Sequence, residues 1–315
     1  MSPPSSLPRR SGAAVRERLM SSIGVVAVGL VALLLGGPVY VGVMLVIGLI
    51  AYHEFCRLAL GVGLAASSLG YGIIVAAALA GYLDNRSIMF AVVTFAALVP
   101  IAVGVLRASA SPVPTGPESL ASPVGLGAWA ATTCGSLFIA IPTMLAISLR
   151  ERSSGGEAPW LDAFANTLAL GWDGRPTGLG WVFTFTLIGW FSDSGAYLIG
   201  RRWGRRLLAP TVSPKKTVEG AIGGLIGAAL AATIGIAVFE LDCPALLGIV
   251  IGLGLGAIGM LGDLGESLIK RQAGVKDSGT LIPGHGGILD RFDAMYVILA
   301  TGWFVVEFVA WFVDR

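Results

Sequence analysis

The 315-residue sequence contains little charge and few of the polar side chains that most enzymes use. Only 13% of its residues are charged and only two are histidines, whereas 55% are hydrophobic. An ordinary soluble domain has roughly 25% charged residues, so this chain could not cover a water-facing surface. The net charge is only +2 and no long basic tract occurs, which argues against a nucleic-acid-binding protein. The composition therefore indicates an integral membrane protein.

Cysteine is also scarce. Cys56, Cys134 and Cys243 are far apart in the sequence, and no CxxC spacing occurs. Neither a structural zinc site nor a disulfide framework is supported. Each cysteine lies in or beside an apolar run, so we expect all three to be buried as small hydrophobic side chains.

Long apolar runs, in contrast, are abundant. Crossing a ~30 Å hydrocarbon core takes about 20 residues at a helical rise of ~1.5 Å. Lipid requires every backbone group to be hydrogen-bonded internally, and no alternating barrel pattern is present. We therefore expect an all-α, polytopic transmembrane protein with short loops. About nine spans are predicted, at residues 21–36, 38–56, 66–83, 88–106, 126–149, 179–200, 218–239, 243–262 and 294–312.

A Pro- and Ser-rich stretch with almost no charge divides these spans into two groups. No internal repeat of the kind found in secondary transporters is evident. The expected organisation is a disordered cytoplasmic tail at 1–20, N-terminal transmembrane helices at 21–107, a linker at 108–125 and a C-terminal transmembrane catalytic region at 126–315.

Basic residues are distributed unevenly among the loops. If the N-terminal arginines are cytoplasmic, nine alternating spans also place segments 57–65, 107–125, 201–217 and 263–293 in the cytoplasm. The last two segments are rich in Lys and Arg, as the positive-inside rule requires. We therefore predict a multi-pass protein of the inner (plasma) membrane whose active site faces the cytoplasm.

Lysine is confined to the same two segments. Arginine would satisfy the positive-inside rule equally well, so this concentration indicates a basic pocket. The residues concerned are Lys215, Lys216, Lys270 and Lys276, with His285 close by in the sequence. The other histidine, His53, lies beside Glu54 at a predicted membrane edge, and we interpret both as interfacial rather than catalytic.

Acidic residues accompany these lysines at the ends of the apolar runs. Asp193 lies inside its predicted span, where a carboxylate is costly unless it is paired, hydrated or metal-bound. Asp263 ends another span, and Asp290 and Asp293 lie one helical turn apart where the last span begins. Carboxylates gathered from several helices would repel one another. A hard cation such as Mg²⁺ would remove that repulsion and bring phosphates with it.

Two short segments have features of anion sites. The glycines of Pro283–Gly287 allow backbone N–H groups to point at an anion, and His285 could donate to a phosphate or act as an acid. In Ser213–Thr217, Thr217 is placed to cap a helix whose positive end would face a phosphate. An ordinary capped helix entry would have the same sequence.

Three blocks of the sequence resemble the phosphatidate cytidylyltransferases, also called CDP-diacylglycerol synthases. The longest block runs through all 27 positions from Ser267 to Asp293 and includes Lys270-Arg271, Lys276-Asp277 and the run from Pro283 to Asp293. The other blocks are Asp193–Tyr197 with Gly200, and Ser213–Gly220, in which Val218 stands where the family commonly has Trp. The resemblance is strong over roughly residues 180–293 and weak before them.

The resemblance implies that CTP and phosphatidate react in the bilayer to give CDP-diacylglycerol and pyrophosphate, with one or two Mg²⁺ ions as cofactor. It implies that Asp263 and Asp290 bind metal, with Asp293 and Asp193 as further members of the metal site. The catalytic residues would be Asp263, Asp290, Lys270 and His285. The substrate-binding residues would be Ser213, Lys215, Lys216, Thr217, Arg271, Lys276, Gly286, Gly287 and Arg291.

Three alternatives remain open at this point. A CTP-dependent lipid kinase would attack the γ-phosphate and release CDP. A transporter or channel for an anionic solute would give flux without consuming CTP, and a non-catalytic scaffold would tolerate the loss of Asp263 and Asp290 together. The sequence predicts no nucleic-acid partner and leaves open whether the chain forms a homodimer.

Overall fold

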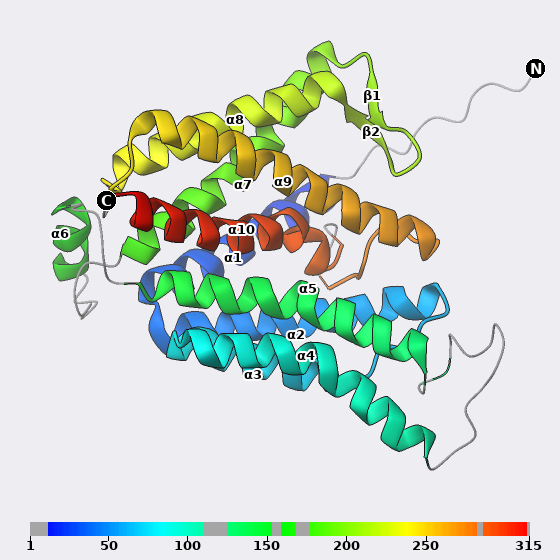
Figure 1. Cartoon of the computed structure of the whole chain (residues 1–315). Coiled ribbons are helices and arrows are strands. Elements are labelled where there is room, and N and C mark those ends of the chain that lie inside the picture. Colours follow the sequence, from blue (N-terminus) through cyan, green and yellow to red (C-terminus); the bar gives the residue numbers. More distant parts are fainter. Residues whose placement is uncertain are drawn as a thin grey trace, which may run out of the picture.

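A bundle of helices running side by side makes up most of the protein (Figure 1). The computed structural model describes residues 12–109, 122, 125–152, 159–167, 177–281 and 286–313. The helices are α1 (Gly12–Leu35), α2 (Gly37–Gly61), α3 (Leu69–Leu83), α4 (Arg86–Ala108), α5 (Leu126–Arg150), α6 (Pro159–Thr167), α7 (Thr177–Trp203), α8 (Val218–Val238), α9 (Ala245–Gln272) and α10 (Leu289–Val313). The strands β1 (Leu207–Ala209) and β2 (Ser213–Thr217) pair as an antiparallel hairpin.

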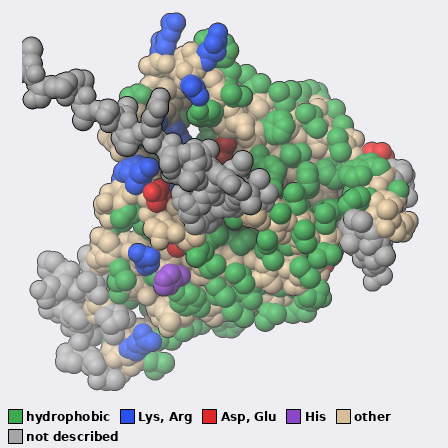
Figure 2. Space-filling view, turned by 180° about the vertical axis from the view of Figure 1, so that it is seen from behind, with side chains coloured by type: hydrophobic (Ala, Val, Ile, Leu, Met, Phe, Trp, Pro, Cys, Tyr) green, Lys and Arg blue, Asp and Glu red, His purple; other side chains and the backbone are tan. Residues whose placement is uncertain are grey.

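The outer surface of the bundle is apolar. Within the described residues, six helices are long and apolar enough to cross a membrane: α2, α4, α5, α8, α9 and α10. Large hydrophobic side chains point outward from them, among them Phe90 (74% exposed), Leu106 (71%) and Leu246 (75%). Figure 2 shows hydrophobic side chains over most of one face, with Lys and Arg gathered towards one end. Soluble proteins rarely expose so much contiguous apolar surface, so the fold is that of an all-α membrane protein.

Each of the nine predicted apolar segments coincides with a helix, α1 to α5 or α7 to α10. Two helices extend well beyond the predicted apolar segments, into sequence that contains basic residues: α9 continues past residue 262 to Gln272, and α10 begins at Leu289 rather than at 294. Both extensions carry polar side chains that turn towards the protein interior. Because these residues lower the local hydropathy, the sequence pattern shows only the apolar, lipid-facing part of each helix.

Other differences concern the loops and the tail. Between the predicted spans, where we expected only short loops, the structure has helix α6 (within residues 150–178) and the β1–β2 hairpin (within residues 201–217), so the protein is not purely helical. Helix α1 begins at Gly12, within the predicted tail. Most of the predicted linker at 108–125 lies outside the described residues.

The cysteines are less buried than expected. All three are free, Cys134 is exposed, and Cys56 and Cys243 are half-buried. The expectation of burial was therefore wrong for Cys134. An apolar side chain on an outward helix face of a membrane protein meets lipid, so it need not be covered by other protein groups.

Glycines allow α7 and α8 to pack closely along their length. A Cβ atom at Gly223 would lie 2.7 Å from the carbonyl oxygen of Gly195, and one at Gly224 would lie 3.0 Å from that of Ser192. Side chains at these positions would push the two helices apart, as in other small-residue helix contacts. This packing fixes the end of α7 beside the start of α8.

The segments rich in Lys and Arg all lie at one end of the bundle. The hairpin, the C-terminal end of α9 and the C-terminal ends of α2 and α4 share this end, whereas α6 and the C-terminus lie at the other (Figure 1). We call the first the basic end and the second the opposite end. The candidate site lies at the basic end.

Candidate active site

A polar cavity of about 590 Å³ lies among α7, α8, α9, α10 and β2. Its volume is within the ~300–1,000 Å³ typical of small-molecule sites. Charges of both signs face it. The acidic residues in its lining are Asp193, Asp263, Asp277, Asp290 and Asp293, and the basic residues are Arg201, Lys215, Lys216, Lys270 and Arg291.

The cavity brings together most of the residues that the sequence singled out. Asp263 and Asp290, which come from different helices, both line it. The other predicted residues in the lining are Asp193, Lys215, Lys216, Thr217, Lys270, Arg291 and Asp293. Those outside the lining are Ser213, Arg271, Lys276, Gly286 and Gly287. His285 lies outside the described residues.

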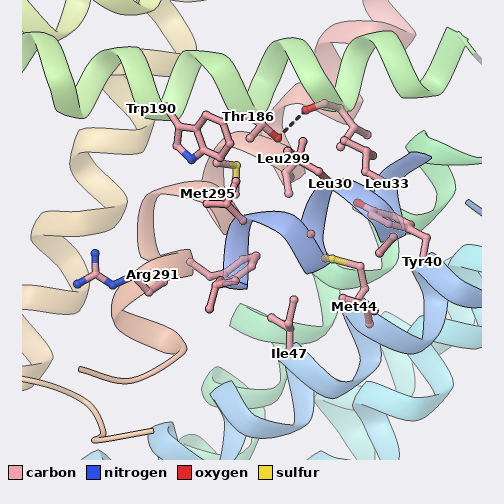
Figure 3. A pocket seen from close by; sticks show the side chains of 17 residues that line it. Leu30, Leu33, Tyr40, Met44, Ile47, Thr186, Trp190, Arg291, Met295 and Leu299 are labelled. Carbon is pink, nitrogen blue, oxygen red and sulfur yellow. Dashed lines mark hydrogen bonds between the residues drawn. The ribbon is translucent and has the colours of Figure 1, made fainter. Parts of the chain in front are cut away.

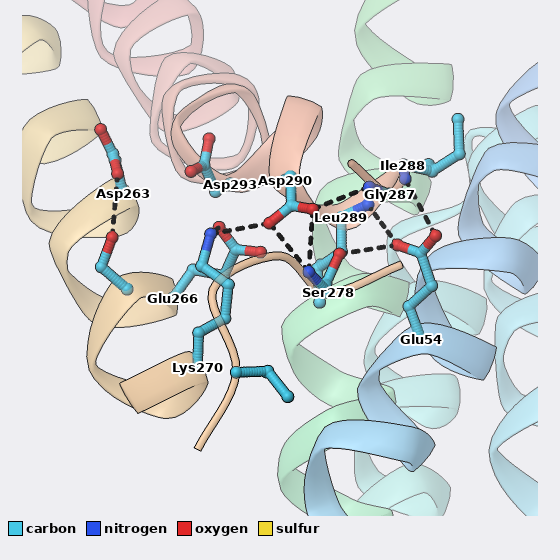
Figure 4. Close-up of polar contacts among 12 residues, drawn as sticks. Glu54, Asp263, Glu266, Lys270, Ser278, Gly287, Ile288, Leu289, Asp290 and Asp293 are labelled. Atoms are coloured by element: carbon cyan, nitrogen blue, oxygen red, sulfur yellow. Dashed lines mark hydrogen bonds and ion pairs between the residues drawn. The ribbon is translucent and has the colours of Figure 1, made fainter. Parts of the chain in front are cut away.

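Lys270 joins α9 to α10. Its Nζ atom lies 2.8 Å from Glu266 Oε2 and 2.7 Å from Asp290 Oδ1 (Figure 4). All three side chains are nearly buried, with exposures of 11% for Lys270, 1% for Glu266 and 7% for Asp290. Two carboxylates so close together would repel each other, and the ammonium group between them offsets that repulsion. Of these three residues, Lys270 and Asp290 line the cavity, and Glu266 lies behind them outside the lining.

Asp290 also fixes the loop that precedes α10. It accepts hydrogen bonds from the backbone N–H of Ser278 (2.9 Å to Oδ2) and of Gly287 (2.7 Å). Gly286 has a φ of 86°, a conformation that other residues rarely adopt. Gly286 and Gly287 therefore shape the turn around Asp290 and do not line the cavity themselves.

Asp263 forms the other side of the cavity. It pairs with Lys216 of β2, and the Ser267 hydroxyl donates to its Oδ1 atom at 3.4 Å. Its carboxylate is also close enough to Asp193 and Asp293 to interact electrostatically with both. Three acids from α7, α9 and α10 are thus neighbours across the cavity, with one lysine among them.

The chemistry of this acidic group fits Mg²⁺. Within the described residues, no three acidic, histidine or cysteine side chains are arranged to hold a metal ion by themselves. Mg²⁺ usually needs only one or two protein carboxylates, because water and substrate phosphates complete its octahedron. Asp263 with Asp193 or Asp293 could supply them. A carboxylate has about four lone-pair sites, and each Asp290 oxygen already accepts two contacts, because the Ser278 N–H also lies 3.1 Å from Oδ1. Asp290 could therefore join only if one of these contacts opened.

The hairpin is attached firmly to α8. As predicted, Thr217 caps α8 and accepts the N–H of Gly220 at 3.1 Å. Glu219 accepts the backbone N–H groups of Arg205 (2.9 Å) and Arg206 (3.2 Å), which holds the start of the hairpin. These contacts fix Lys215 and Lys216 at the edge of the cavity.

Two predicted substrate-binding residues occupy other positions. Arg271 donates to the carbonyl oxygens of Val212 (3.3 Å) and Val275 (3.4 Å), so it connects α9 to the hairpin. Lys276 is exposed and outside the cavity lining. For both, a contact with substrate stays a prediction.

Glu54 was misjudged from the sequence. It is 4% exposed rather than interfacial, and it lies against the loop before α10 (Figure 4). Its carboxylate accepts the Ser278 hydroxyl (3.0 Å) and the backbone N–H groups of Ile288 (3.0 Å) and Leu289 (2.8 Å). The first N–H groups of a helix have no partner within it, and a carboxylate there is favourable. An acid within an apolar segment was the signal that could have found it.

Comparison with known proteins supports the family resemblance that the sequence blocks around this cavity suggested. The chain matches the Cytidylyltransferase family over residues 16–309. It is 46% identical over 129 residues to a phosphatidate cytidylyltransferase of Bacillus subtilis (41% of this chain, 48% of the relative). The figures are 44% over 125 residues for that of Staphylococcus saprophyticus (40% and 48%) and 46% over 127 residues for that of Staphylococcus aureus strain COL (40% and 48%).

These alignments span about half the length of the curated relatives. The family match, in contrast, covers nearly all of this chain and includes every residue of the cavity lining. The chain therefore belongs to the Cytidylyltransferase family.

Proposed function

We propose that this chain transfers the cytidylyl group of CTP to phosphatidate within the membrane. An oxygen of the lipid phosphate attacks the α-phosphorus of CTP. The bond from the α-phosphorus to the bridging oxygen breaks, and the products are CDP-diacylglycerol and pyrophosphate. One observation carries the proposal: a single cavity at the end of an apolar bundle gathers acids and bases from all three sequence blocks of the family.

Electrostatic repulsion is the main obstacle to this reaction, because both reactants are anions. Lys215, Lys216 and Arg201 lie on one side of the cavity, where their charges would bind the CTP phosphates and stabilise the departing pyrophosphate. Arg291 lies in the first turn of α10, where it would bind the lipid phosphate. Lys270 is already paired with two carboxylates, so its role would be to keep Asp290 in place.

The attacking group needs no strong general base. The second pKa of a phosphate monoester is ~6, so the nucleophilic oxygen is largely ionised at neutral pH. The acids of the cavity are therefore free for another task. Asp263, with Asp193 or Asp293, would hold Mg²⁺. When bound, Mg²⁺ would supply Lewis-acid stabilisation of the phosphoryl oxygens.

The membrane arrangement follows from the same proposal. Helices α1 to α5 and α7 to α10 would all cross the plasma membrane, and the basic end would face the cytoplasm, in accordance with the positive-inside rule. CTP would then enter the cavity from the cytoplasm. Phosphatidate would reach it without leaving the bilayer.

Labelled CTP and phosphatidate in mixed micelles, with and without Mg²⁺, test the proposal. We expect Mg²⁺-dependent transfer of the cytidine label into the lipid fraction and one pyrophosphate per lipid formed. Release of CDP together with lipid phosphorylation would instead identify a kinase. Anion flux in vesicles without CTP consumption would identify a transporter. If the protein showed neither enzymatic activity nor flux, it would be a non-catalytic scaffold.

A further inference from the structure

A second cavity, of about 350 Å³, lies among α1, α2, α7 and α10 (Figure 3). Its walls are apolar and include Leu33, Met44, Ile47, Trp190, Met295 and Leu299. The hydroxyl of Thr186 also faces it, but this hydroxyl donates to the carbonyl oxygen of Val182 at 2.8 Å. The Thr186 hydroxyl is thus already paired, and because most of the lining is apolar, the cavity suits a hydrocarbon chain.

Helix α10 separates this apolar cavity from the polar one. Ala294 and Ile298 line the polar cavity, whereas Met295 and Leu299 line the apolar cavity. Residues four apart lie on one face of a helix, so these two pairs mark neighbouring faces of α10. Helix α10 therefore borders the polar cavity on one face and the apolar cavity on the next.

Arg291 belongs to both cavities. It is the one charged residue among the described residues that line the apolar cavity. Its guanidinium group points away from the apolar side chains (Figure 3). A lipid phosphate bound to this group would lie at the mouth of the apolar cavity, with its glycerol beside the first turn of α10.

We propose that the apolar cavity holds one acyl chain of the phosphatidate substrate while Arg291 binds its phosphate. This inference rests on the function proposed above. From Arg291 to Leu299 the cavity extends along eight residues of α10, or ~12 Å at helical rise. One leaflet of a ~30 Å hydrocarbon core is ~15 Å deep, so most of an acyl chain would fit. The cavity would orient the lipid so that its phosphate faces the nucleotide.

Gly29 of α1 helps to keep this cavity open. It lies in the cavity lining, and a Cβ atom there would meet nothing within 4 Å. Gly24 lies on the same helix in equally open space but outside the lining. The variants Gly29→Leu and Gly24→Leu therefore make a matched pair, because both add the same side chain to α1 without a clash.

Kinetics with lipids of two chain lengths test the inference. We expect Gly29→Leu to raise the KM for dipalmitoyl phosphatidate by ~10-fold, which corresponds to about two methylene groups displaced from the cavity. The KM for dihexanoyl phosphatidate and for CTP should not change, because a short chain does not reach α1. Gly24→Leu should resemble the wild type. Equal effects of both variants, or equal effects on both lipids, would overturn the inference.

Photolabelling of the wild-type protein provides a second test that needs no variant. Phosphatidate with a diazirine at the end of one acyl chain should label α1 and α2 within residues 25–47, and excess phosphatidate but not diacylglycerol should compete. Label spread over the outward faces of α4 and α8 would overturn the inference. If the wild type makes no CDP-lipid, the proposed function fails, while the labelling pattern still decides whether the cavity binds this lipid.

Discussion

The two ends of the helix bundle use the same charged residue types in different ways. At the opposite end, Arg150 is 4% exposed and donates to the carbonyl oxygen of Leu33 at 2.6 Å, which satisfies the end of α1. Glu307 of α10 pairs with Arg152 and, at 2.8 Å, with Arg86. Each of these charged side chains thus contacts another part of the protein and joins one helix to another.

At the basic end, in contrast, charges face an open cavity. Asp193 and Asp293 each lie close enough to Asp263 to interact with it electrostatically, and Lys216 forms an ion pair with Asp263. Three carboxylates with one paired lysine leave excess negative charge, which a cation such as Mg²⁺ would balance. The difference teaches that charges paired with other protein groups stabilise the fold at both ends, whereas a group of carboxylates facing a cavity marks the site. The predictions below test that distinction.

The largest effect is expected from Asp263→Asn. The carboxylate lies at the centre of the acidic group, so its loss should lower turnover by at least ~100-fold, the scale for removing a key charge-stabilising group. Stability should change little, because the substitution weakens the pair with Lys216 but also removes the repulsion of Asp263 from Asp193 and Asp293. Turnover and thermal unfolding in detergent measure the two quantities.

Glu307→Gln is the matched control at the opposite end. It removes a carboxylate that joins α10 to two arginines, so it should lower stability while turnover per folded molecule is retained. Normal CTP-dependent turnover by Asp263→Asn would refute the role given to Asp263. Loss of turnover in Glu307→Gln without loss of stability would refute the distinction between the two ends.

The next largest effect is expected from Glu54→Gln. The amide would place its NH₂ group against the backbone donors of Ile288 and Leu289, which the carboxylate now accepts. We expect the free energy of unfolding to fall by about 2–3 kcal/mol, the scale of hydrogen bonds to a charged group. The loop that positions Asp290 should also shift, and kcat should fall by ~10–100-fold, as for small misplacements of a catalytic group.

The adjacent His53→Gln is the control for Glu54. His53 is exposed and contacts the Tyr71 hydroxyl at 3.1 Å, so its replacement should change the unfolding free energy by no more than ~0.5 kcal/mol. Measurement of kcat per folded molecule separates positioning from stability. A destabilised Glu54→Gln protein with normal kcat and normal KM for CTP would show that Glu54 only stabilises the fold.

These residues also show what the sequence could and could not reveal. The helices were predictable because each apolar run coincides with a helix, although only six of these, within the described residues, are long and apolar enough to cross a membrane. The cavity acids stood out because the chain has so little charge. The position of Glu54 within an apolar segment could have singled it out, but its partners could not be predicted, since the Ser278 hydroxyl and the N–H groups of Ile288 and Leu289 are more than 220 positions away in the sequence. The hairpin and the last turns of α9 were missed for a related reason: they are held by tertiary contacts and do not carry an apolar pattern.

A smaller effect is expected from replacing Lys215 and Lys216 together by Ala. Both line the cavity, and removal of phosphate contacts should raise the KM for CTP or for phosphatidate by ~10-fold, as the loss of a charge-assisted hydrogen bond does. Arg205→Ala is the control, because the Arg205 side chain is exposed, lies outside the lining and is not a predicted substrate-binding residue. Unchanged KM values for both substrates in the double variant, or the same increase in Arg205→Ala, would contradict the proposal that Lys215 and Lys216 bind substrate phosphates.

The smallest effect is expected from Arg86→Ala at the opposite end. The Arg86 side chain is 76% exposed, and exposed ion pairs contribute at most ~1 kcal/mol to stability. Arg152, with only 18% exposure, holds the same carboxylate from a more buried position. Arg152→Ala should therefore destabilise the protein more than Arg86→Ala in thermal unfolding, and neither should alter turnover per folded molecule. If Arg86→Ala destabilised the protein more than Arg152→Ala, burial would not determine how much each ion pair stabilises the opposite end. The contrast between the two ends would then depend only on the presence of the cavity at the basic end.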